Sequence, residues 1–170
     1  MIHAAVTNNK SNLGMYAEAL MNRTCDFYKD RGIALIEKRE IPIKITKNLN
    51  DSMIIGKLLK KSTVDYVGSV DGRRFEIEVK QTKNNNWSID MLQEHQYNYL
   101  LSLKKFKIDG YVLVYFSQQE EFYLLDIEWI HKTIQNQKTR TIKYEKISSE
   151  NKKIPITFPG IIDILTVINN

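Results

Sequence analysis

Residues 62–81 read S-T-V-D-Y-V-G-S-V-D-G-R-R-F-E-I-E-V-K-Q, an alternation of apolar and polar residues that is interrupted once, at Asp71-Gly72. An Asp-Gly pair between alternating segments predicts a two-residue hairpin turn, because Gly readily adopts the positive φ that such a turn requires. With these two residues in the turn, Asp65 faces Glu78 across the hairpin. Their β-carbons would then lie about 5 Å apart.

The same register assigns the side chains to two faces, because successive residues of a strand point to opposite sides. One face carries the polar set Thr63, Asp65, Glu78 and Lys80. The other face carries the apolar set Val64, Tyr66, Phe75, Ile77 and Val79. The hairpin is therefore predicted to gather four polar side chains on one side.

The facing carboxylates indicate a cation between them, since like charges directly opposite each other destabilise a sheet. Mg²⁺, with Mn²⁺ as the alternative, prefers oxygen ligands, so we expect Asp65, Glu78 and the Thr63 hydroxyl to bind it. Lys80 would hold the attacking water or neutralise charge on a phosphate. This pattern predicts a metal-dependent phosphodiesterase with Asp65, Glu78 and Lys80 as catalytic residues. The alternative is a solvated strand face that carries a Glu78–Lys80 salt bridge.

Several motifs occur along the chain in the order found in one nuclease family. They are N-L-G-M-Y-A-E-A-L-M-N (12–22), I-P-I (41–43), S-T-V-D-Y-V-G (62–68), F-E-I-E-V-K-Q-T-K-N (75–84), E-H-Q (94–96) and P-G-I-I-D-I-L (159–165). In these motifs the chain resembles the RecU family of Holliday-junction resolvases, which belongs to the restriction-endonuclease-like group with the D…(D/E)-x-K motif. The resemblance runs through most of the chain, apart from the first ten residues.

The resemblance implies a homodimeric endonuclease that resolves four-way DNA junctions by symmetric nicking during recombination and repair. A recombinase is a further candidate partner. The resemblance also implies that Gln96 joins the metal ligands and that Glu18, in the first helix, approaches the metal site. Gln96 lies on the apolar stripe of its predicted helix, where a buried amide needs hydrogen-bond partners. The alternative for Glu18 is an ordinary carboxylate that flanks an apolar stripe.

Periodicity along the chain separates helices from strands. The predicted helices are residues 11–29, 88–105 (with Ser88 as N-cap) and 128–134. The predicted strands are 33–38, the hairpin, 110–116, 121–127 and an edge strand or DNA-facing flap at 138–146, and a last apolar segment, 161–168, should dock on the core or on a second subunit. This order predicts an α/β fold with a mixed central β-sheet flanked by helices, and the resemblance implies a restriction-endonuclease-like core. We expect a mobile arm at residues 1–10 and a single nuclease domain at 11–170.

Residues 43–61 are rich in lysine and carry few acids. The resemblance implies that they form a basic, stalk-like protrusion that enters the centre of a four-way junction. The alternative is a basic surface loop that ends in a short helix. The expected DNA contacts are Lys44, Lys47, Lys57, Lys60, Lys61 and, beside the proposed site, Lys83. Lysines of this kind contact phosphates, which position a protein without reading sequence.

The net charge of +5 favours an acidic partner, of which nucleic acid is the commonest. Cys25 is the single cysteine, which excludes an internal disulfide and suits a reducing cytosol. Apolar runs stay short of the ~18–20 residues of a membrane span, so we expect a soluble, cytoplasmic protein with no membrane partner. Two other functions stay open: a nuclease for other branched or duplex DNA, and a non-catalytic DNA-binding protein that modulates a recombinase.

Overall fold

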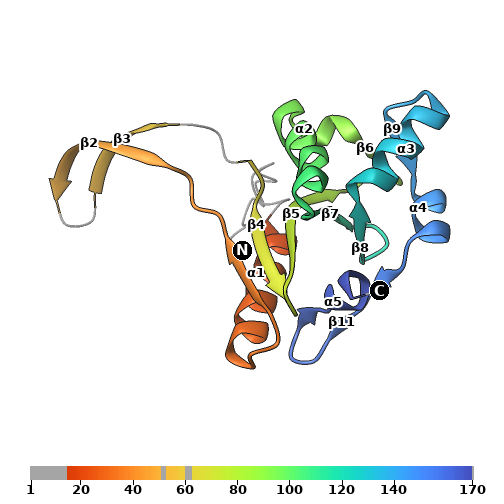
Figure 1. Ribbon diagram of the computed structural model, residues 1–170, viewed down its shortest axis with the longest axis horizontal. Coiled ribbons are helices and arrows are strands. Elements are labelled where there is room, and N and C mark those ends of the chain that lie inside the picture. The colour runs from red at the N-terminus through yellow and green to blue at the C-terminus, as the bar shows by residue number, and fades with distance from the viewer. Residues whose placement is uncertain (1–14, 51–52, 60–62, 170) are drawn as a thin grey trace, which may run out of the picture.

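The computed structural model describes residues 15–50, 53–59 and 63–169 (Figure 1). Its centre is a six-stranded sheet. In spatial order the strands are β1 (Leu35–Lys38), β4 (Tyr66–Val70), β5 (Arg73–Thr82), β7 (Asp109–Phe116), β8 (Glu121–Asp126) and β10 (Lys153–Ile154). β5 and β7 run parallel and the other neighbours antiparallel, so the sheet is mixed. The arm expected at residues 1–10 lies outside the described residues.

Helices cover both faces of the sheet. α1 (Met15–Asp30) and α5 (Leu165–Ile168) contribute to the hydrophobic cluster on one face, whereas α2 (Glu94–Leu103) and α3 (Ile127–Gln137) contribute to the cluster on the other (Figure 1). β7 is buried from Gly110 to Phe116, as its nearly continuous apolar run predicts for a strand that is covered on both sides. The predicted α/β fold with a mixed sheet flanked by helices is confirmed.

The turn between β4 and β5 is the one that the sequence predicts. Asp71 and Gly72 have φ values of 49° and 77°, the left-handed conformation of both central residues in this type of hairpin turn. Gly68 faces Phe75 across the two strands. A Cβ atom on Gly68 would lie 2.3 Å from the Phe75 ring, so only glycine allows the ring to lie over the backbone here.

The predicted register ends where β4 begins. Tyr66 faces Ile77, and the preceding residues leave the ladder. The carboxylate of Asp65, rather than a backbone carbonyl, accepts the hydrogen bond of the Val79 N–H. Val64 consequently packs in the cluster beside α2, on the face opposite to Tyr66. The prediction that Val64 shares a face with Tyr66 is therefore wrong.

The bounds of α1 agree with the prediction better than those of α2. α1 ends at Asp30, two residues before Gly32, whose φ of 63° fits the expected stop. Ser88, however, caps a 3-10 turn, η2 (Ile89–Met91), and α2 starts only at Glu94. A second 3-10 turn, η3 (Lys104–Phe106), follows α2 and leaves Phe106 71% exposed.

A second hairpin extends away from the sheet (Figure 1). It consists of β2 (Ile43–Asn50) and β3 (Met53–Leu58), which pair antiparallel with irregular register. At ~3.3 Å per residue, the eight residues of β2 give the hairpin a length of about 25 Å. The protrusion is thus built from strands, and the alternative of a loop that ends in a short helix is wrong for the described residues.

The C-terminal third adds small elements around the sheet. β6 (Asn86–Ser88) pairs with β9 (Thr141–Lys143), and α4 (Tyr144–Glu150) follows, so the strand expected at 138–146 is shorter and ends in a helix. β11 (Ile156–Thr157) pairs with β12 (Ile161–Ile162). Residues 161–168 dock on the core, which is one of the two predicted alternatives. The buried side chains that make this contact are Ile161, Ile162, Ile164, Leu165 and Ile168. Within the described ranges, no helix is long and apolar enough to cross a membrane.

Candidate functional site

Four of the predicted polar residues meet beside the start of α2. Lys80 Nζ donates a hydrogen bond to Glu78 Oε1 at 2.6 Å, and Gln96 Nε2 donates to the same oxygen at 2.8 Å. Asp65 Oδ2 accepts from the backbone N–H of Val79 at 2.9 Å. The β4–β5 hairpin and α2 thus bring together Asp65, just before β4, with Glu78 and Lys80 of β5 and the amide of Gln96.

The site is enclosed rather than solvated. Glu78 is 1% exposed, because its face of β5 is covered by α2 and by the cluster that includes Val112 on the neighbouring strand. The side chain of Lys80 is 20% exposed and marks the side on which the site meets solvent. The Glu78–Lys80 ion pair exists, but the alternative of a solvated strand face is wrong.

Burial raises the pKa of both Glu78 and Asp65. It raises the pKa of Glu78 to about 7, with a further rise from nearby Asp65 and opposing contributions from Lys80 and Gln96. Burial also raises the pKa of Asp65, against the lowering effect of the Val79 N–H and of Lys80. A further positive charge beside this pair would favour the ionised form of both carboxyl groups.

The residues fit a divalent cation. Glu78 Oε2 is buried and has no hydrogen-bond partner in the described part of the chain, a state that costs about 1–3 kcal/mol for a polar atom. Carboxylate and amide oxygens are the ligands that hard cations prefer. Among the described residues, no three His, Cys, Asp or Glu side chains are arranged to hold a metal. An ion beside Asp65 and Glu78 would therefore need Gln96, water or substrate oxygens as well.

Gln96 holds the start of α2 on β5. It is 7% exposed, and its Oε1 accepts from the backbone N–H of Gln93 at 3.0 Å as part of a capping box. Its Nε2 is bonded to Glu78. Both ends of the amide are satisfied, which explains a polar residue on a buried stripe. To give its oxygen to a metal, the amide would have to exchange the capping bond for the ion.

A second polar cluster lies beside the first, and the sequence analysis missed it. Arg39 donates to Thr63 Oγ1 at 2.7 Å and to Glu76 Oε2 at 2.9 Å. Tyr99 OH lies 2.9 Å from both Glu76 oxygens. The predicted metal ligand Thr63 therefore lies in this cluster. The E-x-E spacing of Glu76 and Glu78 places both on one strand face and was the available signal.

Glu18 lies near the site but is already paired. Its carboxylate forms an ion pair of 2.7 Å with Lys38. Both groups act on the carboxyl of Asp65, since Glu18 raises and Lys38 lowers its pKa. The auxiliary role of Glu18 at a metal site stays a prediction.

The predicted DNA-binding lysines divide into two places. Lys44, Lys47 and Lys57 are exposed on the β2–β3 hairpin, and Lys83 is exposed in the loop that follows β5. Lys60 and Lys61 lie outside the described residues. Lys44 faces Lys57 directly across the hairpin, an arrangement of like charges that destabilises a strand pair without an anionic partner.

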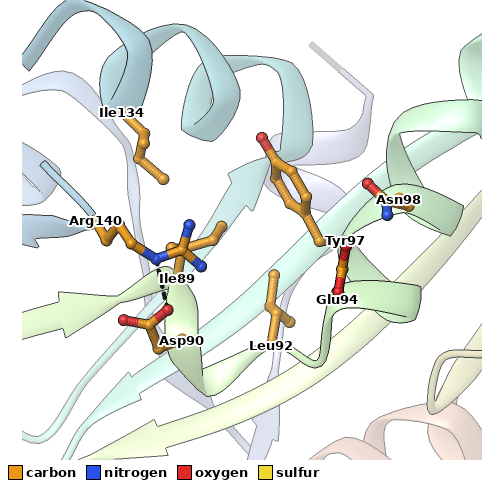
Figure 2. A pocket seen from close by; sticks show the side chains of 8 residues that line it. All are labelled: Ile89, Asp90, Leu92, Glu94, Tyr97, Asn98, Ile134 and Arg140. Carbon is orange, nitrogen blue, oxygen red and sulfur yellow. Dashed lines mark hydrogen bonds and ion pairs between the residues drawn. The ribbon is translucent and has the colours of Figure 1, made fainter. Parts of the chain in front are cut away.

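A cavity of about 520 Å³ lies between η2, α2 and α3, and the side chains that line it are drawn in Figure 2. An ion pair of 2.6 Å between Arg140 and Asp90 lies in it, together with the ring of Tyr97 (Figure 2). The Tyr97 hydroxyl is hydrogen-bonded to His131, which is half-buried. None of the four site residues lines this cavity, which is separate from the acidic site.

The family described as Recombination protein U, RecU, matches residues 12–170. The chain belongs to the RecU family. Two relatives, each called Holliday junction resolvase RecU, come from Mycoplasmopsis pulmonis (34% identical, covering 95% of this chain and 99% of the relative) and Ureaplasma parvum (29% identical, covering 96% and 95%). Among solved structures, Archaeoglobus fulgidus Hjc, a Holliday junction resolvase, has a TM-score of 0.42 at 12% identity over 65% of this chain and 77% of that one.

Proposed function

We propose that this chain is a metal-dependent endonuclease that resolves four-way DNA junctions. The observation that carries the proposal is the pairing of half-buried Asp65 with buried Glu78. Lys80 and Gln96 are bonded to one Glu78 oxygen, and the other oxygen has no partner in the described residues. The names of the family relatives support the same activity and the same substrate.

Asp65, Glu78 and Gln96 would hold the cation, and we propose Mg²⁺, with Mn²⁺ as the alternative, because the donors are oxygens. When bound, such an ion polarises a phosphoryl oxygen and lowers the pKa of a coordinated water. Thr63 accepts a hydrogen bond from Arg39. Its hydroxyl keeps a second lone pair, so it stays a candidate ligand.

The remaining chemistry belongs to Lys80. Its ammonium group touches Glu78 and is partly open to solvent, so it can orient a water or offset the charge that grows on the phosphate during cleavage. Glu78 keeps Lys80 in place through the 2.6 Å ion pair. The enclosed surroundings strengthen each of these electrostatic contacts relative to bulk water.

The β2–β3 hairpin would bind the DNA. It presents Lys44, Lys47 and Lys57 together with half-exposed aliphatic side chains such as Ile45 and Leu58. Lysines neutralise phosphates, and aliphatic groups can pack against unstacked bases at the centre of a junction. Two nicks in strands of like polarity need two sites, so we propose a homodimer with twofold symmetry. Action on chromosomal DNA would place the enzyme in the cytoplasm, and a recombinase is a further candidate partner.

The test is cleavage of a synthetic four-way junction beside matched linear duplex and single strand, with the wild type and Asp65→Asn in Mg²⁺. Paired, symmetric nicks by the wild type alone would support the proposal. Equal cutting of linear duplex would favour a nuclease of broader substrate range. Junction binding by both proteins, with no cutting by either, would contradict the nuclease and leave a non-catalytic DNA-binding protein.

A further inference from the structure

The side chain of Arg39 joins three separate segments of the chain. It donates to Thr63 Oγ1 at 2.7 Å, to Glu76 Oε2 at 2.9 Å and to the Tyr99 hydroxyl at 3.1 Å. Thr63 stands two residues before Asp65, Glu76 two residues before Glu78 on β5, and Tyr99 three residues after Gln96 on α2. Each partner of Arg39 is therefore a near neighbour of one residue of the candidate site.

α2 and β5 meet through two polar contacts of the same kind. Gln96 binds Glu78 and Tyr99 binds Glu76. Residues three apart on a helix are neighbours on one face, and residues two apart on a strand are ~7 Å apart on one face. The two contacts thus fix the helix against the strand at two points, and the position of Gln96 depends on the second contact.

Because Glu76 is buried, its carboxylate requires a positively charged partner as well as the Tyr99 hydroxyl. Glu76 is 6% exposed, and a buried carboxylate is stable only when it is paired and hydrogen-bonded. In the described part of the chain, its ion pair comes from Arg39, whose side chain is 32% exposed. A fork of N–H donors suits this role better than a point charge, because the guanidinium can bond several acceptors at fixed angles.

Arg39 also lies at the base of the β2–β3 hairpin. Its backbone N–H donates to the carbonyl of Asp65 at 2.7 Å. Three residues further on, the carbonyl of Pro42 accepts from the N–H of Leu59, which follows the returning strand. The segment that enters the hairpin is therefore bonded to Asp65 at Arg39 and to the returning segment at Pro42, three residues later.

We propose that Arg39 is a positioning residue that sets Asp65 and Gln96 against Glu78 and couples the site to the seating of the hairpin. This rests on the proposed nuclease function. Among the described residues, the side chain of Arg39 bonds Thr63, Glu76 and Tyr99 and not the side chains of the catalytic residues. Its removal should therefore leave DNA affinity in place while the site loses its geometry.

The experiment compares Arg39→Gln and Tyr99→Phe with Arg74→Gln, which removes the same charge from an exposed arginine at the far end of β5. Junction affinity is measured in Ca²⁺, and the cleavage rate in Mg²⁺ at saturating protein. We expect Arg39→Gln to slow cleavage about 10- to 100-fold, the range produced by misplacement of catalytic groups, with an unchanged dissociation constant. Arg74→Gln should match the wild type.

Tyr99→Phe removes one hydroxyl and should slow cleavage less. The double variant should be no slower than Arg39→Gln alone, because the two residues act as one unit. An unchanged cleavage rate in Arg39→Gln would overturn the proposal. A weaker affinity with an unchanged rate would also overturn it and make Arg39 a DNA contact. If Arg39→Gln does not fold, the rate and affinity of Tyr99→Phe decide in the same way.

A DNA-free measurement separates this proposal from the proposed function. Mn²⁺ should raise the Tm of the wild type, should not raise that of Asp65→Asn, and should raise that of Arg39→Gln less at each concentration, because a displaced Asp65 weakens ion binding. If the wild type cuts no DNA, the nuclease proposal fails and this titration alone decides the role of Arg39. An equal Mn²⁺ response in the wild type and Arg39→Gln would then overturn it.

Discussion

Glu76 and Glu78 stand two residues apart on the same face of β5, are 6% and 1% exposed, and end in opposite states. Both oxygens of Glu76 are hydrogen-bonded, by Arg39 and Tyr99. Glu78 receives Lys80 and Gln96 on one oxygen, whereas its Oε2 has no partner among the described residues.

The difference shows how one strand can carry structure and chemistry side by side. A buried charge must find partners, and the chain supplies a complete set to Glu76 from its own segments. At Glu78 the chain places a second acid, Asp65, nearby, and the described residues supply no donor to Oε2. Glu76, with both oxygens hydrogen-bonded, holds elements of the fold together. Glu78 has one oxygen without a partner in the described residues and can bind a cation there.

The largest expected effect separates the two carboxylates by activity. Glu78→Gln removes a charge from the candidate metal site and should lower junction cleavage by about 10²- to 10³-fold, the scale of losing a preorganised electrostatic contact. Glu76→Gln should cost no more than Arg39→Gln does. Single-turnover cleavage in Mg²⁺ measures both. Equal losses in the two variants would break the distinction between them.

The next effect is a pH dependence that Glu78 should impose. Its pKa is raised by burial from 4.5 to about 7, so the folded chain keeps a proton that the unfolded chain loses between those values. Without divalent ions, stability should therefore fall as the pH rises through this window, by up to about 3 kcal/mol. Urea unfolding in chelator at pH 5 and pH 8 measures the change.

Glu78→Gln is the matched variant for that measurement and should flatten the slope, because it has no proton to lose. Addition of Mg²⁺ at pH 8 should restore stability to the wild type only. A slope of the same size in both proteins would assign the pH dependence to other groups.

The smallest of the three effects concerns Glu76 as a structural group. Glu76→Ala leaves Arg39 and Tyr99 without their shared acceptor and should destabilise the fold by about 2 kcal/mol. Urea unfolding at constant pH in chelator measures this loss. Glu37→Ala, at an exposed position of β1, is the control. A loss no larger than that of the control would contradict the structural role.

The candidate site was largely predictable from sequence because it depends on local rules. The Asp-Gly turn sets the β4–β5 register, which brings Asp65 close to Glu78, and the alternation of the strand adds Lys80. Gln96 could be placed by helical periodicity. Thr63 lies beyond the ladder, where a side chain of Asp65 replaces the backbone pairing, and a two-residue period no longer applies there.

The Arg39 cluster could not be predicted in the same way. Arg39 meets partners 24, 37 and 60 residues further along the chain, and no local period connects such distances. Helix starts were missed for a related reason. Ser88 has the right chemistry for an N-cap and does cap a turn, but the N-cap of α2 is Gln93, five residues later, where the capping box of Gln93 and Gln96 forms.

Lys44 and Lys57, which face each other across the β2–β3 hairpin, should make this element respond to salt in two opposite directions. The β-carbons of directly opposed residues lie about 5 Å apart, which is less than the Debye length of ~8 Å at physiological ionic strength. Added salt therefore relieves their repulsion only in part and stabilises the free hairpin. The same salt weakens every contact between lysine and phosphate. The free hairpin is thus expected to be best ordered at high salt, where it binds DNA least. At low salt the free hairpin is most strained, and there DNA can stabilise it most.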